Sequence, residues 1–284
     1  MFKRKLTGIL HLIRPELTFA AGVCVLAGEI LALGHFPQLS VAVLAFLSIF
    51  CISASAIILN DLFDYEVDKI NTPDRPLPSG AVTRSEVIAL SVLTSLAGLA
   101  CAFILGPDVL VLGIFLWLIA FLYNWRFKQA GLTGNLMVSL SVGLSFIFGA
   151  LTVHLPGNLV VWIFALIAFF IDLGEEIAGD AMDMEGDRKR GSRSIALTRG
   201  RSFALRTSVI LWSLVILIGF IPLVFGWLGL TYLVMILATD ALIVIFSIRL
   251  LRSVSSESGR AAMRGIYLGA TLCILAFILS RLFV

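Results

Sequence analysis

Long apolar segments alternate with short polar ones along the whole chain. Each apolar run is close to the length, about 20 residues, at which a helix crosses the hydrocarbon core of a bilayer. Because backbone groups in lipid must be satisfied within the segment, such runs are expected to be helical. The pattern predicts nine membrane-spanning helices, at residues 17–34, 40–60, 86–106, 108–124, 132–153, 157–178, 203–225, 228–250 and 263–283.

Composition supports the same conclusion. Of the 284 residues, 60% are hydrophobic and only 14% are charged, and the mean hydropathy is +1.05. These values exclude a soluble globular protein and favour an all-α, multi-pass membrane protein. The net charge of +3 is small, no nucleic-acid motif is present, and the four cysteines lack metal-type spacing.

Lys and Arg are distributed unevenly between the loops. The loops at 35–38, 106–108, 155–158 and 226–229 contain neither residue, whereas the alternate loops contain nearly all of them. By the positive-inside rule the N-terminus is cytoplasmic and the C-terminus lies outside. Glu29 and the three histidines are expected at the membrane interface.

Two acidic stretches, residues 60–68 and 180–187, end the second and sixth predicted helices. Positions three or four apart share one face of a helix. Each stretch therefore forms an acidic stripe, the first from Asn60, Asp64 and Asp68 with Asp61 beside it, the second from Glu176, Asp180, Asp183 and Asp187. Four spans separate the stripes, and an even number preserves orientation. The chain is thus expected to be a single membrane domain, residues 1–284, of two parallel four-helix halves plus a ninth helix, with both stripes at the cytoplasmic end.

Several carboxylates close together repel one another unless a cation binds them. Oxygen ligands without His or Cys favour Mg²⁺, which usually completes its shell with water and substrate phosphate. The predicted cofactor is therefore Mg²⁺, and the predicted ligand is a phosphate or diphosphate. Basic side chains suited to phosphate oxygens follow both stripes. The substrate-binding candidates are Arg14, Arg75, Tyr123, Asn124, Lys128, Glu176, Arg188 and Arg193.

Simpler explanations exist for single residues. One interfacial Asp beside Lys or Arg is explained by a surface ion pair, but two matched stripes beside a Pro-Arg-Pro loop are not. The basic run at 188–206 follows mostly from membrane orientation. Asp172, Glu175 and Asp240 lie inside or near spans, where they either line a cavity or pair between helices.

These residues resemble a known family. The pattern Asn60-Asp61-x-x-Asp64-x-x-x-Asp68, the following Asp74-Arg75-Pro76-x-Pro78-Ser79-Gly80 and the later Asp183-x-x-x-Asp187 are similar to the paired aspartate motifs of the UbiA superfamily of intramembrane prenyltransferases. Within it, residues 64–80 and 185–187 look most like the digeranylgeranylglyceryl phosphate synthase and chlorophyll synthase branches. Glu175 departs from the first branch, in which an Arg commonly occupies that position.

The resemblance implies nine helices around a central cavity and a Mg²⁺-dependent reaction. A polyprenyl diphosphate ionises to an allylic cation, which a lipophilic acceptor captures. The donor is expected to be geranylgeranyl diphosphate and the acceptor a geranylgeranylglyceryl phosphate-type hydroxyl, with an aromatic or quinone precursor or a chlorophyllide as the alternative. The implied catalytic residues are Asn60, Asp61, Asp64, Asp68, Asp180, Asp183 and Asp187, and the implied metal ligands among them are Asn60, Asp64, Asp68, Asp183 and Asp187.

Other classes of membrane protein are less compatible with the sequence. An ion-coupled transporter also places carboxylates between parallel repeats, but nearer the bilayer midplane and in broken helices. The Asp-Gly-x-x-Ala-Arg signature of the CDP-alcohol phosphotransferases is missing. A noncatalytic lipid-binding scaffold would leave both stripes without a role.

Overall fold

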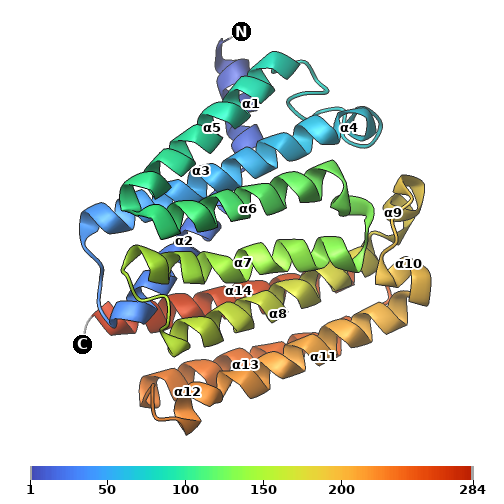
Figure 1. The fold of residues 1–284 in the computed structure, drawn as a ribbon. Helices are drawn as coiled ribbons and strands as arrows, with labels where there is room; N and C mark the ends of the chain where they lie inside the picture. Colours follow the sequence, from blue (N-terminus) through green and yellow to red (C-terminus); the bar gives the residue numbers. More distant parts are fainter. Residues whose placement is uncertain (1, 283–284) are drawn as a thin grey trace. The chain divides into compact units, whose positions relative to one another are not determined.

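The computed structural model describes residues 2–282, and helices dominate this part of the chain (Figure 1). The long helices are α2 (Pro15–Leu33), α3 (Leu39–Phe63), α5 (Arg84–Leu105), α6 (Pro107–Trp125), α7 (Leu132–Thr152), α8 (Leu159–Met182), α11 (Arg201–Gly219), α13 (Leu230–Leu251) and α14 (Ser256–Leu282). Shorter elements lie before and between them: α1 (Phe2–Ile13), α4 (Tyr65–Asn71), η1 (Phe127–Gln129), α9 (Met184–Arg190), α10 (Ile195–Arg199) and α12 (Ile221–Val224).

The predicted spans correspond to the long helices. Within residues 2–282, eight helices are long and apolar enough to cross a membrane. Helix α8 is also long, at 24 residues, but its second half carries Asp172, Glu175, Glu176 and Asp180. The all-α, multi-pass architecture is confirmed, while the count of nine spans stays a prediction that depends on α8.

Two details differ from the expectation. Helix α1 is a separate element that hydropathy did not indicate, because its polar and apolar residues lie on different faces. Helix α14 begins at Ser256 rather than at 263. Its first two turns are polar. The hydroxyl of Ser258 accepts from the backbone N–H of Ser255, and the hydroxyl of Ser255 accepts from the backbone N–H of Ser258, as in a capped helix N-terminus.

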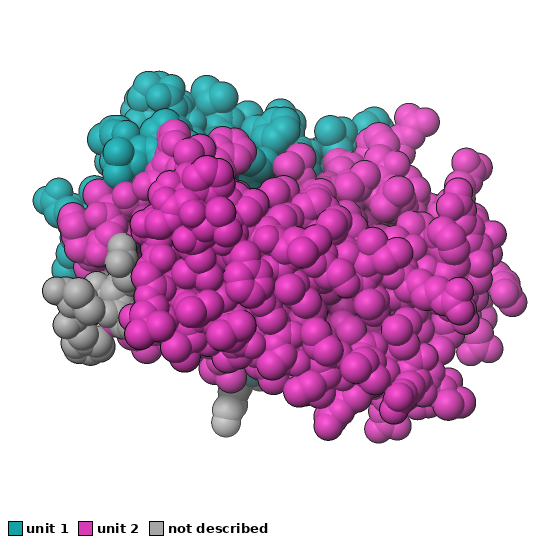
Figure 2. All heavy atoms as spheres, turned by 90° about the horizontal axis from the view of Figure 1, so that it is seen from below, with its two compact units in different colours: residues 1–29, 37–125, 144–156 teal, residues 30–36, 126–143, 157–284 magenta. Residues whose placement is uncertain are grey.

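The chain divides into two compact units, coloured separately in Figure 2. Unit 1 comprises Met1–Glu29, Pro37–Trp125 and Leu144–Pro156. In it, α3 packs against α5 and α6, and a core that includes Ile52, Ala102 and Phe148 is buried among them. The first acidic stripe belongs to this unit.

Small residues bring α2 and α7 close together within unit 1. A Cβ on Gly28 would lie 2.1 Å from the Phe146 carbonyl oxygen, and one on Gly149 would lie 2.1 Å from that of Val25. Glu29 is fully buried there and accepts a 2.7 Å hydrogen bond from the Thr152 hydroxyl. The close helix contact therefore encloses the Glu29 side chain, and its position at the membrane interface stays a prediction.

Unit 2 comprises Ile30–Phe36, Arg126–Gly143 and Gly157–Val284, of which the structure describes the residues up to 282. Helix α8 packs against α11 and α14, and α13 packs against α14. Trp212 of α11 is buried against Gly174 of α8, and its indole N–H donates a 3.1 Å hydrogen bond to the Ile171 carbonyl. This packing fixes the helix that carries the second acidic stripe.

Candidate active site

The first acidic stripe lies where α3 gives way to α4. Asp64 separates the two helices, with φ −83° and ψ 0°. The backbone hydrogen bonds nevertheless continue at four-residue spacing, from Asp64 to Asn60 and from Asp68 to Asp64. The side chains of Asn60, Asp64 and Asp68 therefore follow one another at helical spacing, as the sequence predicts.

Two carboxylates of this region are buried and bound by arginines. Asp61 and Asp68 are each 2% exposed. Arg14 donates to Asp61 at 2.9 Å, and Arg75 donates to Asp68 at 2.6 Å and lies 3.5 Å from Asp61. Thr72 also donates to Asp68, at 2.9 Å. Arginine forks are well suited to such partly buried pairing, so Asp61 and Asp68 act here as the anchors of Arg14 and Arg75.

The loop after α4 holds Arg75 in place. Its backbone turns back on itself through hydrogen bonds from Arg75 to Thr72 and from Ser79 to Arg75. Gly80 adopts a left-handed φ of +70°, which suits a glycine. Leu77 is buried in the core of unit 1 and anchors the loop. Prolines on both sides of Arg75 restrict it further.

Asn60 is oriented by Asn124 at the end of α6. The Asn60 amide donates a 2.8 Å hydrogen bond to the Asn124 carbonyl oxygen. Asn124 is 8% exposed and itself donates to the carbonyls of Ala56 and Ala120. These hydrogen bonds direct the amide nitrogen of Asn60 toward Asn124, and the Asn60 carbonyl oxygen is its candidate atom for metal ligation. The predicted candidates Asn60 and Asn124 thus act together.

Arg14 occupies a corner between α1 and α2. Its φ of +46° lies in the left-handed region, which non-glycine residues adopt at a cost of about 1–2 kcal/mol. Pro15 follows and begins α2. The ion pair with Asp61 offsets that strain, so the corner directs Arg14 toward the first stripe.

Lys69 is directed elsewhere. It forms a salt bridge with Glu66 at 3.2 Å and lies 4.2 Å from the centre of the Tyr65 ring. The hydrogen bond with Glu66 raises the pKa of Lys69. Lys69 is therefore a surface cation of α4, in contrast to Arg14 and Arg75.

The second stripe lies at the corresponding junction of α8 and α9. Asp183 separates these helices, with φ −107° and ψ 12°, and Asp187 donates its backbone N–H to the Asp183 carbonyl. The carboxylates of Asp183 and Asp187 both interact electrostatically with Asp180. Three acidic groups of one sign thus gather at this end of α8, the arrangement that a cation relieves.

The acidic residues inside α8 pair with α7. Asn135 donates a 2.9 Å hydrogen bond to Asp180, and Ser139 donates a 2.8 Å hydrogen bond to Asp172. Lys128 lies near enough to Glu176 to interact electrostatically. Of the two readings for Asp172, pairing between helices is confirmed. Asn135 and Ser139 were missed, although polar residues four apart in an apolar span were an available signal.

The remaining candidates are less constrained. Arg188 and Arg193 are exposed on α9 and the loop after it, and Tyr123 is half-buried on α6. The backbone N–H of Arg193 donates to the carbonyl of Gln129. Two residues after Gln129, Gly131 turns the chain with a φ of +63°. The loop position of Arg193 is therefore fixed while its side chain is exposed.

Arg260 of α14 was not predicted as part of the site. Its guanidinium forms a salt bridge with Asp183. Both side chains are about half exposed, at 44% and 55%, so the pair adds little stability. In the sequence, Arg260 is one of several arginines explained by membrane orientation alone.

The donor set fits Mg²⁺ together with a phosphate ligand. Within residues 2–282, no three His, Cys, Asp or Glu side chains approach closely enough to enclose a metal ion. Magnesium usually binds through one or two carboxylates and completes its shell with substrate phosphate and water. Asn60 with Asp64, and Asp183 with Asp187, each offer such an oxygen pair at helical spacing. The predicted roles of these residues stay predictions.

Comparison with known proteins identifies related chains. The model of the UbiA prenyltransferase family matches residues 21–283. The digeranylgeranylglyceryl phosphate synthase of Thermococcus kodakarensis is 33% identical over 276 residues, which cover 96% of this chain and 97% of that protein. The enzyme of the same name from Methanopyrus kandleri is 33% identical over 273 residues, covering 96% and 98%.

Solved structures share the fold. One, described as digeranylgeranylglyceryl phosphate synthase in membranes, superposes with a TM-score of 0.83 at 27% identity and covers 99% of both chains. A UbiA homolog from Archaeoglobus fulgidus, bound to GPP and Mg²⁺, superposes with a TM-score of 0.72 at 20% identity, covering 98% of this chain and all of that one.

Proposed function

This chain belongs to the UbiA prenyltransferase family, and on that premise we propose that it transfers a geranylgeranyl group from its diphosphate to the hydroxyl of a geranylgeranylglyceryl phosphate-type lipid. The names of its relatives support this acceptor. One structural observation carries the donor half of the proposal. Asn60 and Asp64 lie one helical turn apart beside Asp61 and Asp68, whose charges arginines already balance.

The first step is departure of the diphosphate. Asn60, Asp64, Asp183 and Asp187 would hold Mg²⁺, which supplies positive charge to the diphosphate oxygens. Arg75, Lys128 and Arg193 add cationic groups suited to the same oxygens. As the allylic C–O bond breaks, its electron pair stays with the diphosphate, and the prenyl fragment becomes a delocalised cation. Charge stabilisation at the leaving group therefore provides most of the catalysis.

The second step joins the acceptor to the prenyl group. A lone pair of the acceptor hydroxyl forms a C–O bond with the cation, and the hydroxyl proton passes to the released diphosphate or to water. Since the cation is strongly electrophilic, a strong general base is not required. Both substrates carry long apolar chains, which agrees with the membrane location of the enzyme.

The orientation of the chain is part of the proposal. The distribution of Lys and Arg supports a cytoplasmic N-terminus, cytoplasmic acidic motifs and a C-terminus outside the cell. Reporter domains fused after residues 34, 80 and 284 test it. A reporter active only in the cytoplasm should work at position 80 and fail at the other two, and the reverse pattern would reject this orientation.

The experiment that tests the acceptor offers the purified protein labelled geranylgeranyl diphosphate with a panel of acceptors. The panel contains geranylgeranylglyceryl phosphate, its dephosphorylated form, an aromatic acid, a quinone precursor and a chlorophyllide. The proposal expects a labelled diether phosphate as the main product. A labelled aromatic or chlorophyllide product, with none from the glyceryl lipid, would overturn the acceptor and keep the prenyl transfer. Glu175 bears on this choice of acceptor, because the resemblance to the glyceryl phosphate branch leads us to expect an Arg at that position.

A further inference from the structure

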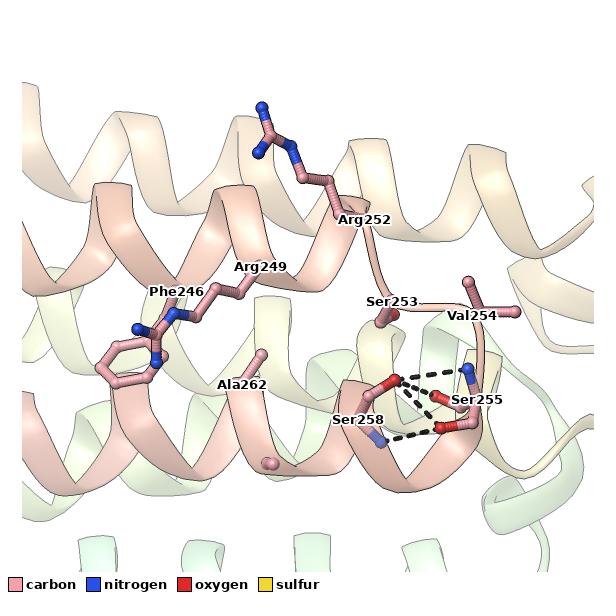
Figure 3. A pocket seen from close by; sticks show the side chains of 9 residues that line it. Phe246, Arg249, Arg252, Ser253, Val254, Ser255, Ser258 and Ala262 are labelled. Carbon is pink, nitrogen blue, oxygen red and sulfur yellow. Dashed lines mark hydrogen bonds between the residues drawn. The ribbon is translucent and has the colours of Figure 1, made fainter.

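A cavity of about 560 Å³ lies between the end of α13 and the start of α14, in unit 2. Figure 3 shows its polar and apolar lining. Phe246, Ala261 and Ala262 contribute apolar surface, and Arg249, Arg252 and the hydroxyls of Ser255 and Ser258 contribute polar groups. The lining is therefore amphipathic, with cations and hydroxyls beside an apolar wall.

The loop between the two helices is rigidly held. Arg201 donates 2.9 Å hydrogen bonds to both the carbonyl and the hydroxyl oxygen of Ser253. The Ser253 hydroxyl donates to the Leu250 carbonyl at 2.6 Å. Ser255 and Ser258 bond each other's backbone N–H through their hydroxyls (Figure 3). These hydrogen bonds hold the backbone that frames the cavity, which lowers the entropic cost of binding there.

The charge of the cavity is not neutralised by the protein. The guanidinium of Arg249 lies 5.2 Å from the centre of the Phe246 ring, which keeps it at the wall. Arg252 is exposed at the end of α13 (Figure 3). Among the ion pairs of residues 2–282, none joins an Asp or Glu to Arg249 or Arg252. Figure 3 shows the two arginine side chains pointing in different directions, so the exposed Arg252 would turn toward Arg249 for both guanidinium groups to reach one anion.

The position of the cavity favours a lipid. Residues 252–255 connect two helices that are each long and apolar enough to span a membrane, α13 and α14. The connection between two spans lies at the depth of the lipid headgroups. Val254 is 95% exposed and Leu251 is 46% exposed beside it, as expected for surface that contacts lipid. An anion bound here would have its apolar chains next to these residues.

We propose that this cavity binds the phosphate headgroup of an anionic membrane lipid, with Arg249 and Arg252 contacting the phosphate and Phe246, Ala261 and Ala262 contacting the first carbons of the lipid. Arginine suits phosphate oxygens because its fork donates two parallel hydrogen bonds. The cavity borders the second acidic motif, because Arg260, next to the lining residue Ala261, pairs with Asp183 and the Ser256 hydroxyl donates to the Met182 carbonyl. Its lining includes no residue of that motif, so the proposal does not depend on the proposed prenyl transfer.

The test measures binding of short-chain phosphatidic acid to the purified protein in neutral detergent by native mass spectrometry. Diacylglycerol of the same chain length and inorganic phosphate serve as the two partial ligands. The proposal expects phosphatidic acid to bind at least about tenfold more tightly than either, since the charged contacts and the apolar contacts each contribute. Equal binding of inorganic phosphate would overturn the lipid assignment, and equal binding of diacylglycerol would overturn the phosphate assignment.

Variants locate the site. Arg249→Gln with Arg252→Gln should weaken phosphatidic acid binding at least about tenfold. Arg199→Gln with Arg206→Gln is the matched control, because Arg199 also lies over a ring, that of Phe203 at 5.0 Å, and the same charge is removed. Ala261→Phe fills the apolar wall without changing charge and should weaken binding as well. Unchanged binding in both the arginine pair and Ala261→Phe, or equal loss in the control, would overturn the proposal.

Discussion

The carboxylates of the first motif divide into two kinds at the residue scale. Asp61 and Asp68 are buried and held by Arg14 and Arg75. Asp64 is half-buried at the junction of α3 and α4. Sequence spacing alone treats these aspartates alike, since it reports their faces and not their partners. We therefore expect neutralisation of Asp61 to lower the stability of the protein, and neutralisation of Asp64 to lower its activity.

Asp61→Asn should lower the free energy of unfolding by about 1–3 kcal/mol, because it removes the charge that Arg14 and Arg75 contact in a buried place. Glu66→Gln is the control, since Glu66 is 80% exposed in its pair with Lys69 and such pairs contribute at most about 1 kcal/mol. Thermal unfolding in detergent compares the two. Equal stability of both variants would contradict the anchoring role of Asp61.

Asn124→Ala should lower prenyl transfer about 10- to 100-fold, the usual effect of losing a residue that orients a metal ligand. The structural reason is that Asn124 accepts the hydrogen bond that orients Asn60. Asn158→Ala is the control, because Asn158 caps the N-terminus of α8 and its hydrogen bonds go to Ala32, Val160 and Val161. The rate at saturating substrate and the Mg²⁺ concentration for half-maximal rate are measured. An unchanged Mg²⁺ requirement would reject the orienting role.

At the scale of elements, close packing of α2 on α7 fixes the interior of unit 1. Gly149→Ala should destabilise the protein by about 1–3 kcal/mol, because the added Cβ would overlap the Val25 carbonyl. Gly179→Ala on α8 is the control, where the new Cβ meets only Met263 at 3.7 Å. There the greater helix propensity of Ala should stabilise by up to about 1 kcal/mol. Thermal unfolding that moves in the same direction for both variants would contradict this packing.

Hydropathy predicted the long helices well, because a membrane span is defined by its length and apolarity, and both can be read from the order of residues. It missed α1, whose apolar residues are spread over one face, and the early start of α14, which a pair of serines determines. The stripes were predicted because helical spacing is local. The pairing of Asp61 with Arg14 was not, since the partners are 47 residues apart and only the folded chain brings them together.

For the whole molecule, the family assignment and the two motifs lead to one chemical claim. Each unit carries an acidic helix junction, Asp64 in unit 1 and Asp183 in unit 2. Asn60 precedes Asp64 by four residues, and Asp187 follows Asp183 by four. Each junction therefore keeps two oxygen-bearing side chains on one helix face. We therefore expect both motifs to serve Mg²⁺-dependent departure of the diphosphate.

The most direct measurement is release of diphosphate from geranylgeranyl diphosphate in the presence of acceptor, by wild type, Asp64→Asn and Asp187→Asn. Wild type should require Mg²⁺, stop in EDTA and recover with excess Mg²⁺. Each variant should lose at least about 100-fold in rate, as for loss of a major charge-stabilising group, while its thermal unfolding stays near that of wild type. Wild-type turnover in EDTA, or unchanged turnover in both variants, would contradict the account.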